Sequence, residues 1–263
     1  MGFILIYEEG EDMIYKYYSN LSEYAINNFI NDKLCFSDVD QFNDLCEFQA
    51  EMNEKNSLPN KEDNLTDDLI KLQKLRVRIC CFSYNSNLDN MWGYYANNGK
   101  GFCLGYDENE IEGLLPQLIL KNVSYDDSIP ELREDMAPED LVMSQITHKK
   151  ECWRFENEIR ACFFLNWEEM TRLSLDFKDS ILKDKYEFVF SDMAKVDLPI
   201  LPPGCLEEYR KPAIWYAPKN VLIPAKPKVL IMGKNCPRYL KEVLANIANQ
   251  KGIPIKKQGD INV

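Results

Sequence analysis

Short apolar runs separated by polar turns recur along the chain, and their length is typical of strands in a packed sheet. The run RVRICCFS has hardly a polar position at its centre, so we expect it to lie centrally in the sheet. EIRACFFL is the clearest strand in the sequence. The full set of predicted strands is Met13–Tyr18, Lys33–Ser37, Arg76–Ser83, Gly101–Asp107, Leu118–Asp127, Glu158–Leu165, Lys228–Gly233 and Ile253–Lys257.

Helical periodicity appears between several of these runs. Asn20, with Glu23 three residues on, resembles a capping box, and Leu21, Tyr24, Ala25 and Phe29 would then share one face. The last helix begins at Pro237, ends at Gly252 and carries an apolar face of Leu240, Val243, Leu244, Ile247 and Ala248. Two further helices are predicted over about Asp67–Lys74 and Leu88–Asn98, the second capped by Asp89 or Asn90.

Alternating strands and helices without an internal repeat predict a single α+β domain covering residues 1–263. We expect a mixed or mostly antiparallel central sheet flanked by helices. A hydrophobic fraction of 45% supplies enough apolar side chains for its core. The polar, acidic stretch from residue 51 to residue 68 is predicted to be a surface excursion.

Charge narrows the classes of partner. Asp and Glu number 43 against 31 Lys and Arg, which gives a net charge of −12. Because phosphate backbones are bound by clustered cations, this balance argues against bulk nucleic-acid binding. A local basic pocket is compatible with it, so a small nucleotide-like ligand or a protein target stays among the expected partners.

Nine cysteines and one histidine bear on metal chemistry and location. No CxxC pair occurs and most cysteines lie in apolar runs, so we expect buried free thiols and no metal site. The apolar run Phe3–Tyr7 is too short for a signal peptide or a membrane span, and a cytoplasmic location is expected. His148, beside Lys149 and Lys150, is predicted to be exposed at a polar helix end.

The segment WRFENEIR, Trp153 to Arg160, is the strongest candidate for chemistry. On a strand, Glu156, Glu158 and Arg160 would share one face by alternation. Two carboxylates beside a guanidinium form either a general base with an orienting partner or a salt-bridged ladder that stabilises the strand. The sequence leaves both open.

Two glycine-containing segments offer weaker signals. Lys100 stands between two glycines after an aromatic run, where it could meet an anion, while Trp92 and Tyr95 in that run read as core residues. Gly233-Lys234-Asn235 leads from a strand into a helix, which resembles a generic anion site. Neither segment is a Walker A loop, and no GxSxG motif supports a serine hydrolase.

Several of these segments, in this order, resemble the large bacterial family catalogued as domain of unknown function 2971. The chain differs from the family's common pattern at Leu45, where a proline is usual, and at Tyr94 and Gly99, where histidines are frequent. That family implies no particular reaction. The resemblance is carried by IYKYYS, LCFSDVDQFNDLCEF, ICCFSYNSNLDNMWGYYANNGKGFCLGYD, KKECWRFENEIR and KVLIMGKNCP.

A more distant likeness is to the NAD-dependent ADP-ribosyltransferases. It implies NAD as a co-substrate, with Lys16 or Tyr17 at the first strand position, Ser37 at the second and Glu158 at the third. Glu158 would stabilise an oxocarbenium-like transition state, and Glu156 would orient the acceptor. The chain departs from those enzymes in having no Arg or His at the first position. The predicted catalytic residues are Glu158, Glu156 and Lys16, and the predicted substrate-binding residues are Tyr15, Tyr17, Ser37, Asn43, Trp92, Lys100 and Arg160.

Three functions therefore compete. The first is an ADP-ribosyltransferase-like or NAD-cleaving enzyme with Glu158 as its catalytic carboxylate. The second is a non-catalytic ligand-sensing or protein-interaction module in which the charged segment is structural. The third is a metal-dependent nuclease, which would require Asp44, Glu47, Glu156 and Glu158 to gather around a divalent ion.

Overall fold

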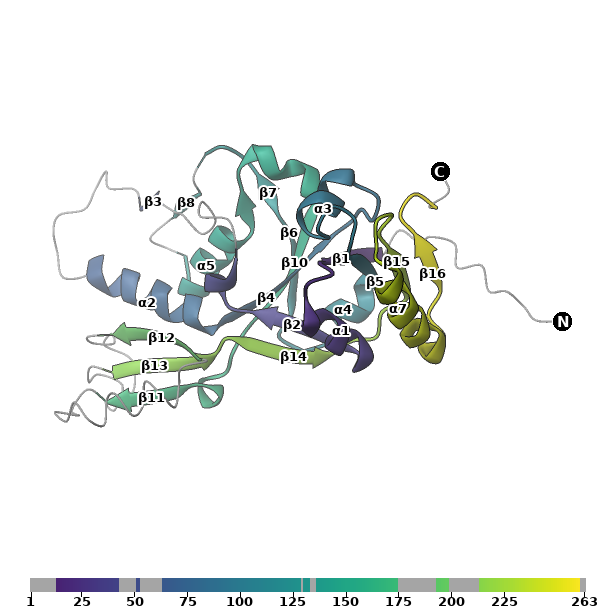
Figure 1. Ribbon diagram of the computed structural model, residues 1–263. Coiled ribbons are helices and arrows are strands. Elements are labelled where there is room, and N and C mark those ends of the chain that lie inside the picture. The colour runs from purple at the N-terminus through teal and green to yellow at the C-terminus, as the bar shows by residue number, and fades with distance from the viewer. Residues whose placement is uncertain are drawn as a thin grey trace.

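A nine-stranded sheet forms the centre of the protein in the computed structural model, which describes residues 13–42, 51–52, 63–128, 130–132, 136–174, 193–198 and 213–260. Its pairings are antiparallel except between the last two strands, which run parallel. The predicted α+β fold with a mostly antiparallel sheet is confirmed (Figure 1). Along the sheet the order is β14 (Asn220–Pro224), β2 (Lys33–Ser37), β4 (Val77–Ser83), β1 (Met13–Tyr18), β5 (Phe102–Asp107), β15 (Val229–Met232) and β16 (Ile255–Lys257), with β10 (Glu158–Phe164) and β6 (Ile119–Asn122) branching from β4.

The sheet forks at β4. One edge of β4 pairs with β10 from Val77 to Ser83. On the other edge, Ser83 lies opposite Tyr15 of β1 and Ile79 lies opposite Ser37 of β2. Two strands therefore meet the same edge at separate points, with the middle of β4 between them. The fork divides the sheet into a block of β1, β5, β15 and β16 and a block of β14, β2, β4, β10 and β6.

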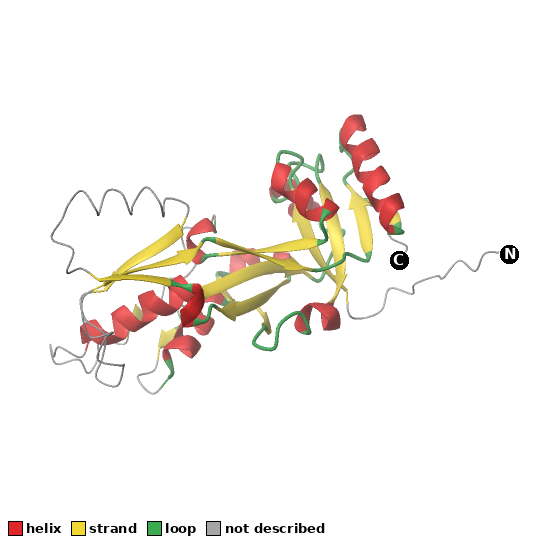
Figure 2. Ribbon diagram, turned by 90° about the horizontal axis from the view of Figure 1, so that it is seen from below, coloured by secondary structure: helices red, strands yellow, loops and turns green. Residues whose placement is uncertain are grey.

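Helices lie around this sheet at positions that Figures 1 and 2 show from two sides. α1 (Glu23–Ile30) contacts α7 (Arg238–Lys251) at the end of the molecule that carries β16. At the opposite end, α2 (Asp63–Arg76) packs on α5 (Pro138–Ile146) and on the three-stranded sheet. That second sheet has the order β11 (Thr171–Ser174), β13 (Ala213–Pro218) and β12 (Met193–Leu198).

The remaining elements are short. Two are α-helices, α3 (Asp89–Tyr94) and α4 (Glu108–Glu112). The described 3₁₀ turns are η1 (Val39–Gln41), η3 (Glu151–Glu156) and η4 (Trp167–Glu169). Two pairs of two-residue strands run parallel, β3 (Glu51–Met52) with β8 (Glu131–Leu132) and β7 (Ser124–Tyr125) with β9 (His148–Lys149). In the part of the chain that the structure describes, no helix combines the length and apolarity needed to cross a bilayer.

The main core lies between the sheet and its helices. Alternate positions of the strands, such as Ile14, Phe36 and Phe82, point into it, and α1 and α7 contribute Phe29 and Leu244. A smaller core under α5 unites Ile79 with residues of that helix and with Cys162. Burial of this apolar surface is the main force that fixes the position of each strand.

Most predicted elements are confirmed to within a few residues. Met13–Tyr18 and Lys33–Ser37 have the predicted bounds, and Gly252 ends α7 in the left-handed conformation. α2 is longer than predicted because it already begins at Asp63, inside the stretch taken for an acidic excursion. Residues 53–62 of that stretch lie outside the described residues. The predicted strand Leu118–Asp127 is divided by Val123 into β6 and β7.

The predicted caps of two helices are wrong. Ser22, not Asn20, caps α1, because its Oγ accepts the amide N–H of Ala25 at 3.2 Å. Leu21 precedes the helix and is 76% exposed, and Tyr24 is 83% exposed, so neither belongs to the buried face, which contains Ala25 and Phe29. α3 has Leu88 at its N-cap and no side-chain cap.

His148 and Val243 also differ from expectation. His148 is half-buried in the short strand β9, because its backbone pairs with Ser124 and the chain there is extended. Val243 is 43% exposed, since the buried stripe of α7 runs through Leu240, Leu244 and Ile247.

Close backbone approach at Gly101 gives a test of this packing. A Cβ on Gly101 would lie 1.9 Å from the carbonyl oxygen of Tyr18, so Gly101→Ala must push β1 and β5 apart. We expect the free energy of unfolding to fall by about 3 kcal/mol. The control is Gly93→Ala, where no atom lies within 4 Å of the added Cβ. Urea unfolding of both variants measures the difference, and equal stability would contradict this packing.

Candidate functional site

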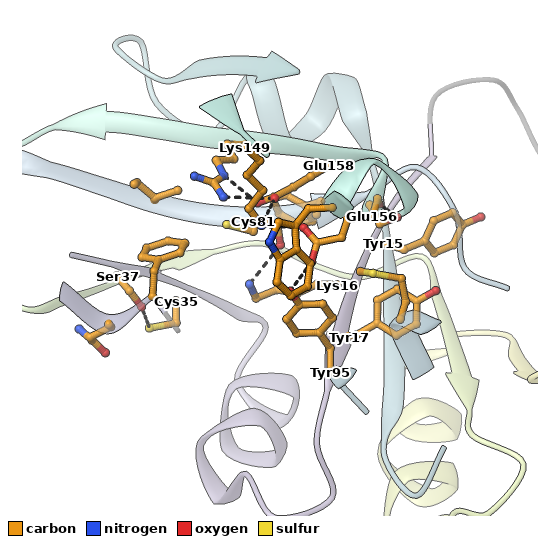
Figure 3. A pocket seen from close by; sticks show the side chains of 18 residues that line it. Tyr15, Lys16, Tyr17, Cys35, Ser37, Cys81, Tyr95, Lys149, Glu156 and Glu158 are labelled. Atoms are coloured by element: carbon orange, nitrogen blue, oxygen red, sulfur yellow. Dashed lines mark hydrogen bonds and ion pairs between the residues drawn. The ribbon is translucent and has the colours of Figure 1, made fainter. Parts of the chain in front are cut away.

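A cavity of about 610 Å³ opens at the fork of the sheet. Its walls come from β1, β2, β4 and β10, with α3 and η3 closing one side. Figure 3 shows Ser37 and Cys35 of β2 on one side, Tyr15 and Tyr17 of β1 on the other, and Glu158 of β10 above them. The cavity therefore exists because β1 and β2 separate where they leave β4.

The sequence predicted that Trp153–Arg160 forms one strand, and this prediction is wrong. Glu151–Glu156 forms the 3₁₀ turn η3, Asn157 adopts the left-handed conformation (φ 43°, ψ 56°), and β10 begins at Glu158. Asparagine is one of the few residues that tolerates this conformation, because its short side chain adds little strain. Glu158 and Arg160 do share a strand face, but Glu156 reaches the cavity through the turn.

Two hydrogen bonds hold that turn against the end of β4. Ser83 Oγ donates to the carbonyl oxygen of Glu156 at 2.6 Å. The backbone N–H of Tyr84 donates to the carbonyl oxygen of Asn157 at 3.1 Å. Because the turn is anchored to β4 at both residues, the two carboxylates that flank Asn157 are fixed relative to the sheet.

Lys149 joins the two carboxylates. Its ammonium lies 2.6 Å from Oε2 of Glu156 and 2.8 Å from Oε2 of Glu158. All three side chains are almost completely buried. Lys149 comes from β9, whose pairing with β7 positions the lysine behind η3. One cation thus neutralises the space between two anions that would otherwise repel each other.

Arg160 forms the second ion pair of the group. Its Nε lies 2.7 Å from Oε1 of Glu158 and its NH2 group lies 3.2 Å from Oε2, a two-point contact between planar groups. The NH1 group donates to the carbonyl oxygen of Ile146, the last residue of α5. Arg160 thereby connects the Glu158 carboxylate to the helix behind the cavity.

The two carboxylates have opposite pKa shifts. Burial works to raise the pKa of Glu158, but the charges of Arg160 and Lys149 outweigh it and hold that pKa well below its ordinary value. Burial raises the pKa of Glu156, and the charge of Lys149 only partly opposes this shift. Glu158 therefore stays ionised at neutral pH, while Glu156 takes up a proton more readily than an exposed glutamate.

Tyr95 completes the environment of Glu156. Its hydroxyl donates a short hydrogen bond to Oε1 of Glu156. Burial, followed by the neighbouring charge of Glu156, raises the pKa of Tyr95, so the phenol stays protonated and acts as a donor. This bond connects the end of α3 to η3 across one side of the cavity.

The structure brings most of the predicted site residues together. Side chains of Tyr15, Lys16, Tyr17, Ser37, Glu156, Glu158 and Arg160 all line the cavity. Lys16 extends toward the middle of β4 and donates from its ammonium to the carbonyl oxygen of Cys81 at 3.2 Å. Ser37 Oγ donates to Oδ1 of Asn220 at 3.0 Å.

Two predicted site residues, Trp92 and Lys100, are not part of the cavity lining. Trp92 is buried in the core, where its Nε1 donates to the carbonyl oxygen of Ser86 at 2.9 Å and its ring meets the edge of Tyr17. Lys100 is exposed on a turn that packs on Gly233 and Asn235. Asn43 lies outside the described residues. Trp92 thus supports the wall of the cavity from behind, as a core residue.

Sequence reasoning missed Lys149, Tyr95 and Cys81. Lys149 looked like one of two lysines at an exposed helix end, and nothing in the neighbouring residues shows that it is buried. Tyr95 was read as core, although it is partly exposed and its hydroxyl faces a carboxylate. Cys81 contributes its backbone carbonyl to Lys16 and its thiol to Glu158, whereas its place in an apolar run indicated only a buried thiol.

A comparison with protein families identifies a segment at the centre of this site. The model of the family described as "Protein of unknown function (DUF2971)" matches residues 91–161. The match confirms the predicted resemblance to this family over those residues. The matched segment runs from α3 to the start of β10 and contains Tyr95, Lys149, Glu156, Glu158 and Arg160. No curated protein and no solved structure matches the chain.

The residues proposed for a metal-dependent nuclease do not form a ligand set in the described ranges. Glu156 and Glu158 are bridged by the Lys149 ammonium. Asp44 and Glu47 lie outside the residues that the structure describes. Within those residues, no three side chains of His, Cys, Asp or Glu are placed to hold a metal ion. The seven cysteines described there are free thiols.

Replacing Lys149 by methionine tests the bridge. Removal of one partner from a buried ion pair leaves an uncompensated charge, so we expect the free energy of unfolding at neutral pH to fall by about 3–5 kcal/mol. The pKa of Glu156 rises further without the lysine. A carboxyl whose folded-state pKa is raised contributes stability at low pH that is lost as the pH rises, so the defect should shrink on acidification.

Urea unfolding at about pH 8 and about pH 5 measures that dependence. Lys150→Met is the matched control, because Lys150 is the exposed neighbour of the same type. A Lys149→Met defect that is small, or equal at the two pH values, would show that the bridge does not set the charge state of Glu156.

Proposed function

We propose that the cavity is the active site of an enzyme that breaks the N-glycosidic bond of NAD and transfers the ADP-ribosyl group to water or to an acceptor. One observation carries the proposal. Lys16, Ser37 and Glu158 come from three strands far apart in the sequence, and all three line a single cavity. These are the positions that the likeness to ADP-ribosyltransferases implies for such a site.

The two carboxylates suit different parts of this reaction. When two acidic groups in one site have pKa values shifted in opposite directions, each is fitted to a different role. Glu158, held ionised by Arg160 and Lys149, would stabilise the positive charge that develops on the ribose. Glu156, with a raised pKa, would accept a proton from the attacking hydroxyl group.

The bond changes balance as follows. The bond between ribose C1′ and the nicotinamide nitrogen breaks, and its electron pair stays on nitrogen, which makes the leaving nicotinamide neutral. The oxygen of water or of the acceptor forms the new bond to C1′, and its proton passes to Glu156. No oxidant or reductant is required. The products are nicotinamide and an ADP-ribosylated acceptor, or free ADP-ribose when water attacks.

The cavity has the size and lining that this substrate requires. Small-molecule sites usually measure about 300–1,000 Å³ and have mostly apolar walls with a few polar groups. Here Tyr17, Phe42, Tyr95 and Trp153 line the walls, and 610 Å³ falls within that range. Aromatic walls can stack on a planar base or on nicotinamide.

A second candidate function rests on a different observation. Both carboxylate oxygens of Glu158 already form ion pairs, with Arg160 and with Lys149. A carboxylate whose two oxygens are both in ion pairs can have a purely structural role. The cavity would then bind a ligand without converting it. Under that alternative, the protein is a non-catalytic ligand-sensing or protein-interaction module.

Release of nicotinamide from NAD separates the two functions. We expect the purified protein, with or without a cell extract as a source of acceptors, to release nicotinamide, and Glu158→Gln to lower the rate by about 100-fold or more. Glu151→Gln is the control, because Glu151 is an exposed carboxylate on the same turn. Thermal unfolding verifies that both variants are folded. A rise in Tm with NAD but no nicotinamide release would favour the non-catalytic module.

A further inference from the structure

The charges that line the cavity do not cancel. Among the residues that the structure describes, five charged side chains face it, three of them cationic (Lys16, Lys149 and Arg160) and two anionic (Glu156 and Glu158). The ion pairs described above join the two anions to Lys149 and Arg160. The described part of the cavity lining thus has one positive charge in excess, although the protein as a whole carries −12.

The excess charge resides on Lys16. Its ammonium donates to the carbonyl oxygen of Cys81 at 3.2 Å. No carboxylate among the described residues forms an ion pair with it, and its other hydrogen-bond partner is the thiol of Cys80. An ammonium has three donors, so the bonds to the carbonyl of Cys81 and to the thiol of Cys80 leave one donor for a ligand.

The ammonium of Lys16 lies at the cavity, where a ligand can reach its remaining donor. β1 and β2 both run antiparallel to β4, so Tyr17 of β1 and Cys35 of β2 come level with Cys81 on either side of the fork. Lys16 extends into this gap, between the rings of Tyr18 and Phe82, each within 6 Å of its ammonium. Figure 3 shows it between Ser37 and Cys35 on one side and Glu156 on the other.

The polar groups at the two ends of the cavity differ in charge. The β2 end presents Ser37, Cys35 and Gln41, which are neutral, whereas at the η3 end the carboxylates of Glu156 and Glu158 are paired with Lys149 and Arg160. An anionic group would be attracted to the ammonium at the fork, because the cations of the η3 end are already engaged by the two carboxylates. A ligand with one anionic part and one hydroxylated part therefore has a single favourable orientation.

We propose that Lys16 is the anion subsite of this cavity and binds a phosphate group of the ligand, so that the ligand's sugar hydroxyls face Glu156 and Glu158. The choice of phosphate rests on the proposed function, because NAD carries a diphosphate. Lys16 then has a binding role, distinct from the role of Glu158. It compensates ligand charge in a protein whose overall field repels anions.

Equilibrium binding of three probes tests the subsite in the full chain. ADP should bind more tightly than adenosine, and inorganic pyrophosphate should compete with ADP. Lys16→Met removes the charge and keeps the length of the side chain. It should weaken ADP binding by about 10- to 100-fold, the usual effect of losing a charge-assisted contact, and leave adenosine binding within about 2-fold. Lys100→Met, at an exposed lysine outside the cavity lining, should bind all three probes like the wild type.

The subsite would be overturned if Lys16→Met bound ADP with unchanged affinity. It would also be overturned if the wild type bound ADP and adenosine equally well, or bound neither measurably. If Lys16→Met does not fold, salt dependence of the wild type decides. Added NaCl should weaken ADP binding and leave adenosine binding unchanged. An equal response of both probes would also overturn it.

Nicotinamide release by the wild type, measured beside its ADP binding, distinguishes the subsite from the proposed reaction. ADP binding that depends on Lys16, in a wild-type protein that releases no nicotinamide, would support the subsite and reject the reaction. Nicotinamide release by a protein whose ADP affinity does not depend on Lys16 would support the reaction and reject the subsite.

Discussion

The buried ammonium of Lys149 is the interaction on which the charged side of the cavity depends. Without it, two carboxylates separated by the single residue Asn157 would share a water-poor space, and one would have to be protonated. With it, the carboxylates remain distinct, because Arg160 adds a second cation to Glu158 alone. The asymmetry between the two glutamates therefore comes from the placement of two cations, one shared and one not.

This arrangement has a cost that the fold compensates elsewhere. Buried ion pairs are expensive to desolvate, and apolar side chains of similar size often stabilise a protein as well or better. The cavity also interrupts the sheet, since β1 and β2 each leave β4 after a short contact. The extensive core beneath the sheet supplies the stability that permits both features. Such expense at a cavity is typical of sites that act on ligands, which is consistent with the proposed function.

The sequence predicted the elements far better than the site geometry. β1, β2 and α7 were found because their apolar periodicity and end signals are local properties of the chain. Glu158 and Arg160 were found because a charged pair at the start of an apolar strand stands out. Lys149 was missed because its burial comes from the packing of β9 behind η3, which no local pattern encodes. Asn157 was missed because the letters of WRFENEIR alternate as a strand would, while the left-handed turn depends on its anchoring to Ser83 and Tyr84.

The fork in the sheet has a mechanical consequence. The block that contains β5 and β15 and the block that contains β2 and β10 are connected where Tyr15 faces Ser83, so a sheet of nine strands has a seam near its middle. A molecule lodged in the cavity touches both sides of that seam. A ligand in the cavity would therefore contact both halves of the sheet, and the two halves would resist mechanical separation more strongly when the ligand is bound.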